Sequence, residues 1–325
     1  MAKSILEVEK LRVNFKINKQ ITSAVEDVSF KIEEGMTLGV VGESGCGKSV
    51  TATSIMGLLP KSVGSIAEGS IKLDGQELTG MSASELRKIR GNKISMIFQE
   101  PMTSLNPVYT IEKQLSEMIM AHRKMSRKEA FEIGVQMLEK VGIPSPRQRM
   151  KEYPHQLSGG MRQRVMIAMA LSCEPLLLIA DEPTTALDVT IQAQILDLMA
   201  DLKKHMSTAI MLITHDMGVV AEVSDYVMVM YAGKVVEYAD VNTIFKEPKP
   251  PYTIGLLKSI PRLDQDVEEL YTIEGTVPAL TEMPKGCRFS TRCPHCTDRC
   301  KEADPGLITV GKSQVRCFKY LNDGQ

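Results

Sequence analysis

The chain has 325 residues, 43% of them hydrophobic, so it can bury a core and, at roughly 150 residues per domain, form about two domains. Its 39 basic and 40 acidic side chains nearly cancel, which gives no support for a nucleic-acid partner. The N-terminus lacks an apolar signal core, and no uncharged apolar run approaches the ~20 residues that cross a bilayer. We therefore expect a cytosolic chain whose role at a membrane, if it has one, comes through a partner.

The first part of the chain predicts strands that lead into a glycine-rich loop. Alternating apolar and polar residues over 5–15 and 24–32 indicate half-exposed antiparallel strands. The apolar run 36–41 predicts a buried strand that enters Gly42-Glu43-Ser44-Gly45-Cys46-Gly47-Lys48-Ser49, a full match to the G-x-x-x-x-G-K-[ST] phosphate loop. Lys48 would neutralise the β and γ phosphates, and the Ser49 hydroxyl would hold Mg²⁺. The residues expected to bind nucleotide here are Gly42, Ser44, Gly45, Cys46, Gly47, Lys48, Ser49 and Val50.

The sequence gives weaker evidence for two further ligand contacts, by Phe15 and Gln99. Phe15, on the first predicted strand, could stack on an adenine ring, although a lone Phe on a strand more often belongs to the core. Strands are also predicted over 69–74 and 93–98, and Gln99 follows the second. An amide at the carboxyl end of a parallel strand can reach a metal ion and an attacking water, so Gln99 is a candidate ligand.

The segment between Gln99 and Ser158 has a helical period from 110 to 141 and predicts a mostly helical insertion in an α/β core. At its end, Ser158-Gly159-Gly160 stands immediately before a predicted helix over 161–171. A hydroxyl, unpaired backbone N–H groups and the positive end of a helix dipole meet there, which suits an anion. Ser158, Gly159 and Gly160 therefore form a second phosphate-binding candidate.

Carboxylates follow the next buried strand. The apolar run 175–180 ends in Asp181-Glu182, where Asp181 is suited to hold Mg²⁺ and Glu182 to deprotonate the hydrolytic water. Asp188 precedes an amphipathic helix, where it could be a simple N-cap or contact nucleotide. The buried strand predicted over 208–214 ends at His215, which could contact a γ-phosphate. A hairpin is predicted over 226–238.

Taken together, these motifs resemble those of ATP-binding cassette (ABC) ATPases. Residues 42–49 resemble the Walker A loop, Gln99 the Q-loop, 157–163 the signature motif, 177–182 Walker B, 186–188 the D-loop, and His215 the switch histidine. The resemblance implies a P-loop α/β core with a mixed sheet, an antiparallel β subdomain and a helical subdomain at about 100–172, all within residues 1–240. In that family the signature residues bind the ATP of a facing cassette. The resemblance also assigns nucleotide contacts to Phe15 and Asp188, a metal contact to Gln99, and catalytic roles to Glu182, His215 and Gln99.

The remaining residues, 241–325, predict a small cysteine-rich extension after a proline-rich boundary. It holds five of the seven cysteines, and such clustering in a cytosolic chain favours metal or cluster binding over disulfides. Spacing alone does not separate Zn²⁺ from an iron–sulfur cluster. Cys287-Arg288-Phe289 and Arg292-Cys293-Pro294 resemble the extension of ATPase subunits in dipeptide and oligopeptide importers. That resemblance implies a [4Fe–4S] cluster on Cys287, Cys293, Cys300 and Cys317, with Cys296 outside the pattern or replacing a ligand.

The resemblance further implies an ATPase that energises peptide import at the cytoplasmic face of the cell membrane. Its partners would be a second, related ATPase subunit, two transmembrane permeases and an extracytoplasmic solute-binding protein, with no nucleic acid. A nickel or other small-solute importer of the same group is an alternative. A soluble cassette ATPase carrying an iron–sulfur or zinc sensor is another; a cassette acting on DNA or ribosomes would need coiled-coil arms or a second set of motifs, and this chain has neither.

Overall fold

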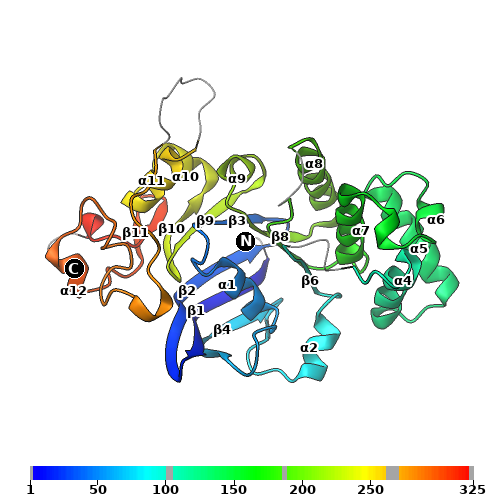
Figure 1. The fold of residues 1–325 in the computed structure, drawn as a ribbon, viewed down its shortest axis with the longest axis horizontal. Helices are drawn as coiled ribbons and strands as arrows, with labels where there is room; N and C mark the ends of the chain where they lie inside the picture. Colours follow the sequence, from blue (N-terminus) through cyan, green and yellow to red (C-terminus); the bar gives the residue numbers. More distant parts are fainter. Residues whose placement is uncertain (1–2, 100–104, 185–188, 261–270, 322–325) are drawn as a thin grey trace. The chain divides into compact units, whose positions relative to one another are not determined.

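The computed structural model describes residues 3–99, 105–184, 189–260 and 271–321 (Figure 1). These residues form two compact units, which we describe separately. The first unit contains residues 1–5, 33–35 and 80–211, and the second contains 6–32, 36–79 and 212–325. Both sides of the predicted domain boundary at 240/241 lie in the second unit, so that boundary stays a prediction.

The second unit begins with an antiparallel sheet in the order β2-β1-β4-β5. Its long strands bury alternate residues, as the sequence pattern predicts, and Val8 of the first strand pairs with Ile71 of β4. The predictions of antiparallel strands over 5–15 and 24–32 are confirmed. The strands are β1 (Ser4–Ile17), β2 (Gln20–Glu33), β4 (Gly64–Leu73) and β5 (Gln76–Glu77).

The second unit also contains a mixed sheet in the order β11-β12-β10-β9-β3-β8, to which β8 contributes only residues 212–213 in this unit. β3 runs parallel to β9, and all five of its residues are buried, as expected for a strand covered on both faces. The predicted hairpin over 226–238 is confirmed as β9 and β10, whereas β11 and β12 are absent from the sequence predictions. The strands are β3 (Thr37–Val41), β8 (Ala209–Ile213), β9 (Tyr226–Tyr231), β10 (Lys234–Asp240), β11 (Ile308–Val310) and β12 (Ser313–Val315).

Short helices complete the second unit. Helix α1 follows the glycine loop directly. Helices α10 and α11 follow β10 in the chain and pack beside it, and α10 also contacts β9 (Figure 1). The short helices are α1 (Lys48–Ile55), α9 (Met217–Val223), α10 (Val241–Lys246), α11 (Pro251–Lys258) and α12 (Asp298–Glu302), with single 3₁₀ turns at Leu280–Glu282 and Phe318–Tyr320.

The first unit combines the sheet order β8-β7-β6 with a group of helices. Its parallel strands are β6 (Ile94–Ile97) and β7 (Leu177–Asp181), each at a position that the sequence predicts. The buried side chains of Leu115 on α4 and Leu138 on α5 come from the predicted helical periodicity, and these helices pack together with α7 (Figure 1). The helices are α2 (Ala83–Ile89), α4 (Ile111–His122), α5 (Arg127–Lys140), α6 (Pro146–Arg149), α7 (Gly159–Leu171) and α8 (Val189–Met206), with a 3₁₀ turn at Pro154–Gln156.

Helices α4 to α7 fall inside the range 100–172 for which the sequence predicts a helical subdomain. In the described ranges, no helix is long and apolar enough to cross a bilayer.

Candidate functional site

The phosphate loop has a backbone that requires its glycines. Gly42 has φ +148°, and a Cβ there would lie 2.1 Å from the carbonyl oxygen of Met230. Gly47 has φ +102° and is the N-cap of α1, so it turns the chain into the helix in a conformation that L side chains rarely adopt. The strand, the tight loop and the helix therefore follow each other as the sequence predicts.

Lys48 is held at the centre of this loop. Its ammonium donates hydrogen bonds to the carbonyl oxygens of Gly42 at 2.7 Å and Glu43 at 3.1 Å, and the residue is only 6% exposed. Ser44, Gly45 and Ser49 are exposed, so the loop's outer side is accessible to a ligand. The ammonium has three N–H donors, so it can donate to a phosphate while the two carbonyl groups hold it in position.

Cys46 lies underneath the loop rather than on its outer side. Its side chain is fully buried, and burial raises the pKa of its thiol. Its backbone N–H donates to the Glu43 carbonyl oxygen at 3.2 Å. Any contact of Cys46 with nucleotide would therefore come from the backbone. Val50, in the first turn of α1, is partly buried.

The structure places two other predicted nucleotide contacts in the second unit. Phe15 on β1 is partly buried, and its ring packs over Gly64 of β4 so closely that a Cβ at Gly64 would lie 3.0 Å from it. His215 is exposed directly after β8, where Asp216 caps α9 by accepting from the Gly218 N–H at 2.8 Å. Their roles stay predictions.

The first unit brings together two predicted catalytic side chains. The Gln99 amide donates to a carboxylate oxygen of Glu182 at 2.9 Å. Asp181, at the end of β7, is 5% exposed, while Glu182 has left the strand with φ +47°. This left-handed backbone is uncommon for a non-glycine residue, and it turns the chain sharply just where a carboxylate would have to meet a water molecule.

The signature residues form an exposed helix start. Ser158 is the N-cap of α7, where its hydroxyl accepts from the Met161 N–H at 3.3 Å. Ser158 and Gly159 are exposed, and a Cβ on Gly160 would lie 3.0 Å from a methyl carbon of Ile191, a tight contact. The helix start that the sequence predicts is therefore present in this unit, and its binding of an anion stays a prediction.

Sequence reasoning included Gln163 in the signature motif but assigned it no role; it lies one turn into α7. It is fully buried, and its amide donates to the carbonyl oxygen of Pro183, the residue after Glu182. Gln163 thus connects the signature helix to the turn that carries the predicted base. The burial of Gln163 is set by the fold, so its place in the signature motif was the signal in the sequence. Asp188, predicted to contact nucleotide, lies outside the described residues.

The C-terminal cysteines surround a pocket of about 370 Å³ within the second unit. Cys287, Cys293, Cys300 and Cys317 line it together with Phe289 and Phe318, whereas Cys296 does not. Burial raises the pKa of the Cys287 thiol to about 11. In the arrangement that the described residues adopt, no group of three or more His, Cys, Asp or Glu side chains could hold a metal ion.

Known protein families match both the N-terminal part and the C-terminal extension of this chain. The sequence model of the ABC transporter family matches residues 25–185, and that of the oligopeptide/dipeptide transporter C-terminal region matches residues 236–300. The oligopeptide transport ATP-binding protein AppD of Bacillus subtilis is 54% identical over 322 residues, which cover 99% of this chain and 98% of AppD. The chain belongs to the family of ATP-binding subunits of oligopeptide and dipeptide ABC transporters. OppD of Escherichia coli is 52% identical over 99% of this chain and 95% of its own.

Members of this ABC family bind ATP with Mg²⁺ and hydrolyse it to drive transport, so this chain is an ABC ATPase. Among solved structures, the dimeric post-hydrolysis state of the cassette MJ0796, bound to ADP and Pi, is 27% identical with a TM-score of 0.66. It covers 73% of this chain, and 99% of the MJ0796 chain is matched. The predicted fold class is confirmed by this similarity.

Proposed function

We propose that this chain hydrolyses ATP to energise the import of dipeptides or oligopeptides. The observation that carries the proposal is the match along nearly the whole chain to subunits named for oligopeptide and dipeptide transport, including their C-terminal region. Two transmembrane permeases and an extracytoplasmic solute-binding protein complete the transporter, and the chain docks on it at the cytoplasmic face of the membrane. Peptide-dependent ATP hydrolysis by the reconstituted complex tests this cargo. Stimulation by nickel and not by peptides would contradict it.

The catalytic roles follow from the chemistry at each position. Glu182 would deprotonate the attacking water. Asp181, Ser49 and Gln99 would hold Mg²⁺, which would neutralise charge on the phosphates. Lys48 neutralises the β and γ phosphates, and His215 contacts the γ-phosphate. The hydrogen bond from Gln99 to Glu182 supports the assignment of both to one reaction centre.

The exposed signature helix start supports a head-to-tail pair of cassettes. Ser158 and its glycines provide an anion site at the N-terminus of α7, in addition to the phosphate loop at α1. A nucleotide bound between two subunits would use the phosphate loop of one and the signature residues of the other. The second subunit is a related ATPase, and cleavage of the γ-phosphate lets the two separate because the closed state loses its bridge.

A Glu182→Gln variant tests the mechanism. The neutral amide keeps the shape of the side chain but cannot accept the proton, so we expect ATP binding within about twofold of wild type and turnover reduced at least ~100-fold. Glu174→Gln, the same change at an exposed position of the first unit, should hydrolyse ATP normally. Wild-type turnover by Glu182→Gln would remove Glu182 as the base.

We further propose that the cysteine pocket binds a [4Fe–4S] cluster through Cys287, Cys293, Cys300 and Cys317. The four thiols line one cavity, although in the arrangement of the described residues no three of them are placed to hold a metal ion, so cluster binding would draw them closer together. A bound cluster would replace the thiol protons of these four partly buried cysteines and would cross-link the extension.

Metal analysis of anaerobically purified protein distinguishes the cluster from zinc. Iron with acid-labile sulfide and visible absorbance should be present in wild type and in Cys296→Ser, and lost in Cys300→Ser. One equivalent of zinc without iron would overturn the cluster. Loss of iron from Cys296→Ser would instead assign Cys296 as a ligand.

A further inference from the structure

The second residue of the phosphate loop, Glu43, is held by two residues of the C-terminal extension. Its carboxylate receives two hydrogen bonds from the guanidinium of Arg292, at 2.6 and 3.0 Å. Its backbone N–H donates to the Tyr252 hydroxyl at 3.0 Å. Side chain and backbone of Glu43 are therefore both fixed from outside the loop.

Arg292 is itself fixed. Its side chain is 4% exposed, and it donates to the carbonyl oxygens of Glu274 at 2.8 Å and Ile273 at 3.0 Å. It also reaches the Tyr231 hydroxyl at 3.3 Å. The pairing with Glu43 raises the pKa of Arg292 further, so this arginine stays charged. With its nitrogen atoms occupied in this way, the guanidinium has little freedom to follow a moving loop.

Tyr252 is supported by a buried aromatic cluster. Its ring centroid lies 4.6 Å from that of Tyr231 and 5.3 Å from that of Phe289, and these last two are 5.1 Å apart. All three side chains are buried. Packed aromatic rings of this kind resist displacement, so the hydroxyl that accepts from Glu43 has a defined position.

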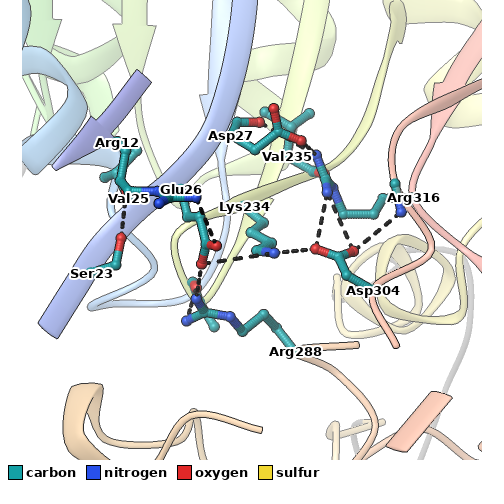
Figure 2. Close-up of polar contacts among 12 residues, drawn as sticks. Arg12, Ser23, Val25, Glu26, Asp27, Lys234, Val235, Arg288, Asp304 and Arg316 are labelled. Atoms are coloured by element: carbon teal, nitrogen blue, oxygen red, sulfur yellow. Dashed lines mark hydrogen bonds and ion pairs between the residues drawn. The ribbon is translucent and has the colours of Figure 1, made fainter. Parts of the chain in front are cut away.

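The same part of the extension is attached to the cassette by ion pairs that do not involve the phosphate loop (Figure 2). Arg288 pairs with Glu26 on β2, and Lys234 at the start of β10 pairs with Asp304. Arg316 pairs with Asp27 at 2.8 Å and with Asp304 at 3.2 Å. Each of the three basic side chains is at most 11% exposed. The extension would therefore stay in place if the contact between Arg292 and Glu43 alone were removed.

The position of Glu43 determines where Lys48 lies. The carbonyl oxygens of Gly42 and Glu43 accept hydrogen bonds from the Lys48 ammonium, the group that meets the phosphates. A displacement of Glu43 would move both acceptors and leave the ammonium less well ordered. We propose that Arg292 and Tyr252 are positioning residues for ATP: they hold Glu43, and through it the phosphate loop and Lys48, in the arrangement that binds nucleotide. This inference rests on the ATPase activity and not on what fills the cysteine pocket.

Titration of the full-length chain with a fluorescent ATP analogue tests the proposal. Arg292→Met keeps the aliphatic part of the side chain and removes the guanidinium, and we expect its Kd for nucleotide to rise about tenfold. Glu43→Gln should weaken binding less. The double variant should bind no more weakly than Arg292→Met, because the two residues act through one contact. In steady-state hydrolysis, KM for ATP should rise while kcat stays within about twofold.

Control variants separate positioning from general stability. Arg147→Met removes a similar two-pronged contact, between Arg147 and Glu132 at 2.9 and 2.6 Å, and should leave the Kd unchanged. Tyr252→Phe removes only the hydroxyl and should raise the Kd about threefold with the aromatic cluster intact. Arg292→Lys should recover part of the affinity. Wild-type Kd in both Arg292→Met and Tyr252→Phe, or additive losses in the double variant, would overturn the proposal even if the melting temperature falls.

Discussion

Glu237 gives a quantitative prediction about how the stability of this protein depends on pH. This carboxylate lies in β10 and is fully buried by the elements that follow it in the chain. Burial raises its pKa from 4.5 to about 7, although the backbone N–H of Lys249, at 3.1 and 3.3 Å from its two oxygens, opposes the change. The folded protein therefore keeps a proton on Glu237 at pH values where the unfolded chain has lost it.

The sign and size of the change in unfolding free energy follow from the linkage between proton binding and folding. Between about pH 4.5 and 7 the folded state binds more protons at Glu237 than the unfolded state does, so the free energy of unfolding falls as the pH rises. The two pKa values differ by about 2.5, and one pKa unit corresponds to about 1.36 kcal/mol. Ionisation of Glu237 should therefore remove about 3 kcal/mol of stability by pH 8, as an order of magnitude.

Glu237→Gln removes this ionisation and keeps an oxygen that can accept from Lys249. We expect its free energy of unfolding relative to wild type to increase by about 3 kcal/mol from pH 5 to pH 8, measured by urea unfolding in matched buffers. Glu247→Gln is the control, because Glu247 is exposed and also lies beside Lys249. A difference between Glu237→Gln and wild type that is the same at both pH values would refute the reasoning.

Two other predictions concern the loop and the ion pairs. Gly42→Ala should lose at least ~2 kcal/mol of stability and most ATP binding, because its Cβ would lie 2.1 Å from the Met230 carbonyl oxygen. A Cβ added at Gly45 (φ +76°) would have no other atom within 4 Å, so Gly45→Ala should lose only the ~1 kcal/mol of its unfavourable φ. Equal losses of stability in Gly42→Ala and Gly45→Ala, measured by thermal unfolding, would contradict the steric argument. Asp304→Asn should destabilise by about 3 kcal/mol in urea unfolding. Burial alone would raise the pKa of Asp304, but Lys234 and Arg316 hold it lower, so wild type should lose this contribution as the pH falls through that lowered value. If Asp304→Asn destabilised the protein by the same amount at acid pH as at neutral pH, this explanation would be wrong.

The sequence was sufficient for the parts of the site that short motifs encode. Each candidate phosphate site is a turn followed by a helix, so the residue types around Lys48 and Ser158 specify the backbone there. The strand that ends at Asp181 was recognisable because a strand buried on both faces is continuously apolar.

The contacts of the extension could not be predicted in the same way. Glu43 and Arg292 are 249 residues apart in sequence, and nothing in either local pattern specifies the other. β11 and β12 have three residues each, too few to show a period of two, and they are strands because β12 pairs with β10. Cysteine and arginine spacing in the extension was visible in the sequence, but the partners of those side chains are set by tertiary structure.

The arginines of the extension explain why it is more than an appended module. A buried charge that loses its partner destabilises a protein, whereas a paired one contributes little net stability and fixes one arrangement. Arg288 and Arg316 carry such charges to β2, and Arg292 carries one to the phosphate loop. The first two pairs determine where the extension lies, and the third places a rigid contact on Glu43. The attachment of the extension through Arg288 and Arg316 does not require the contact of Arg292 with Glu43, so that contact points to a role at the phosphate loop.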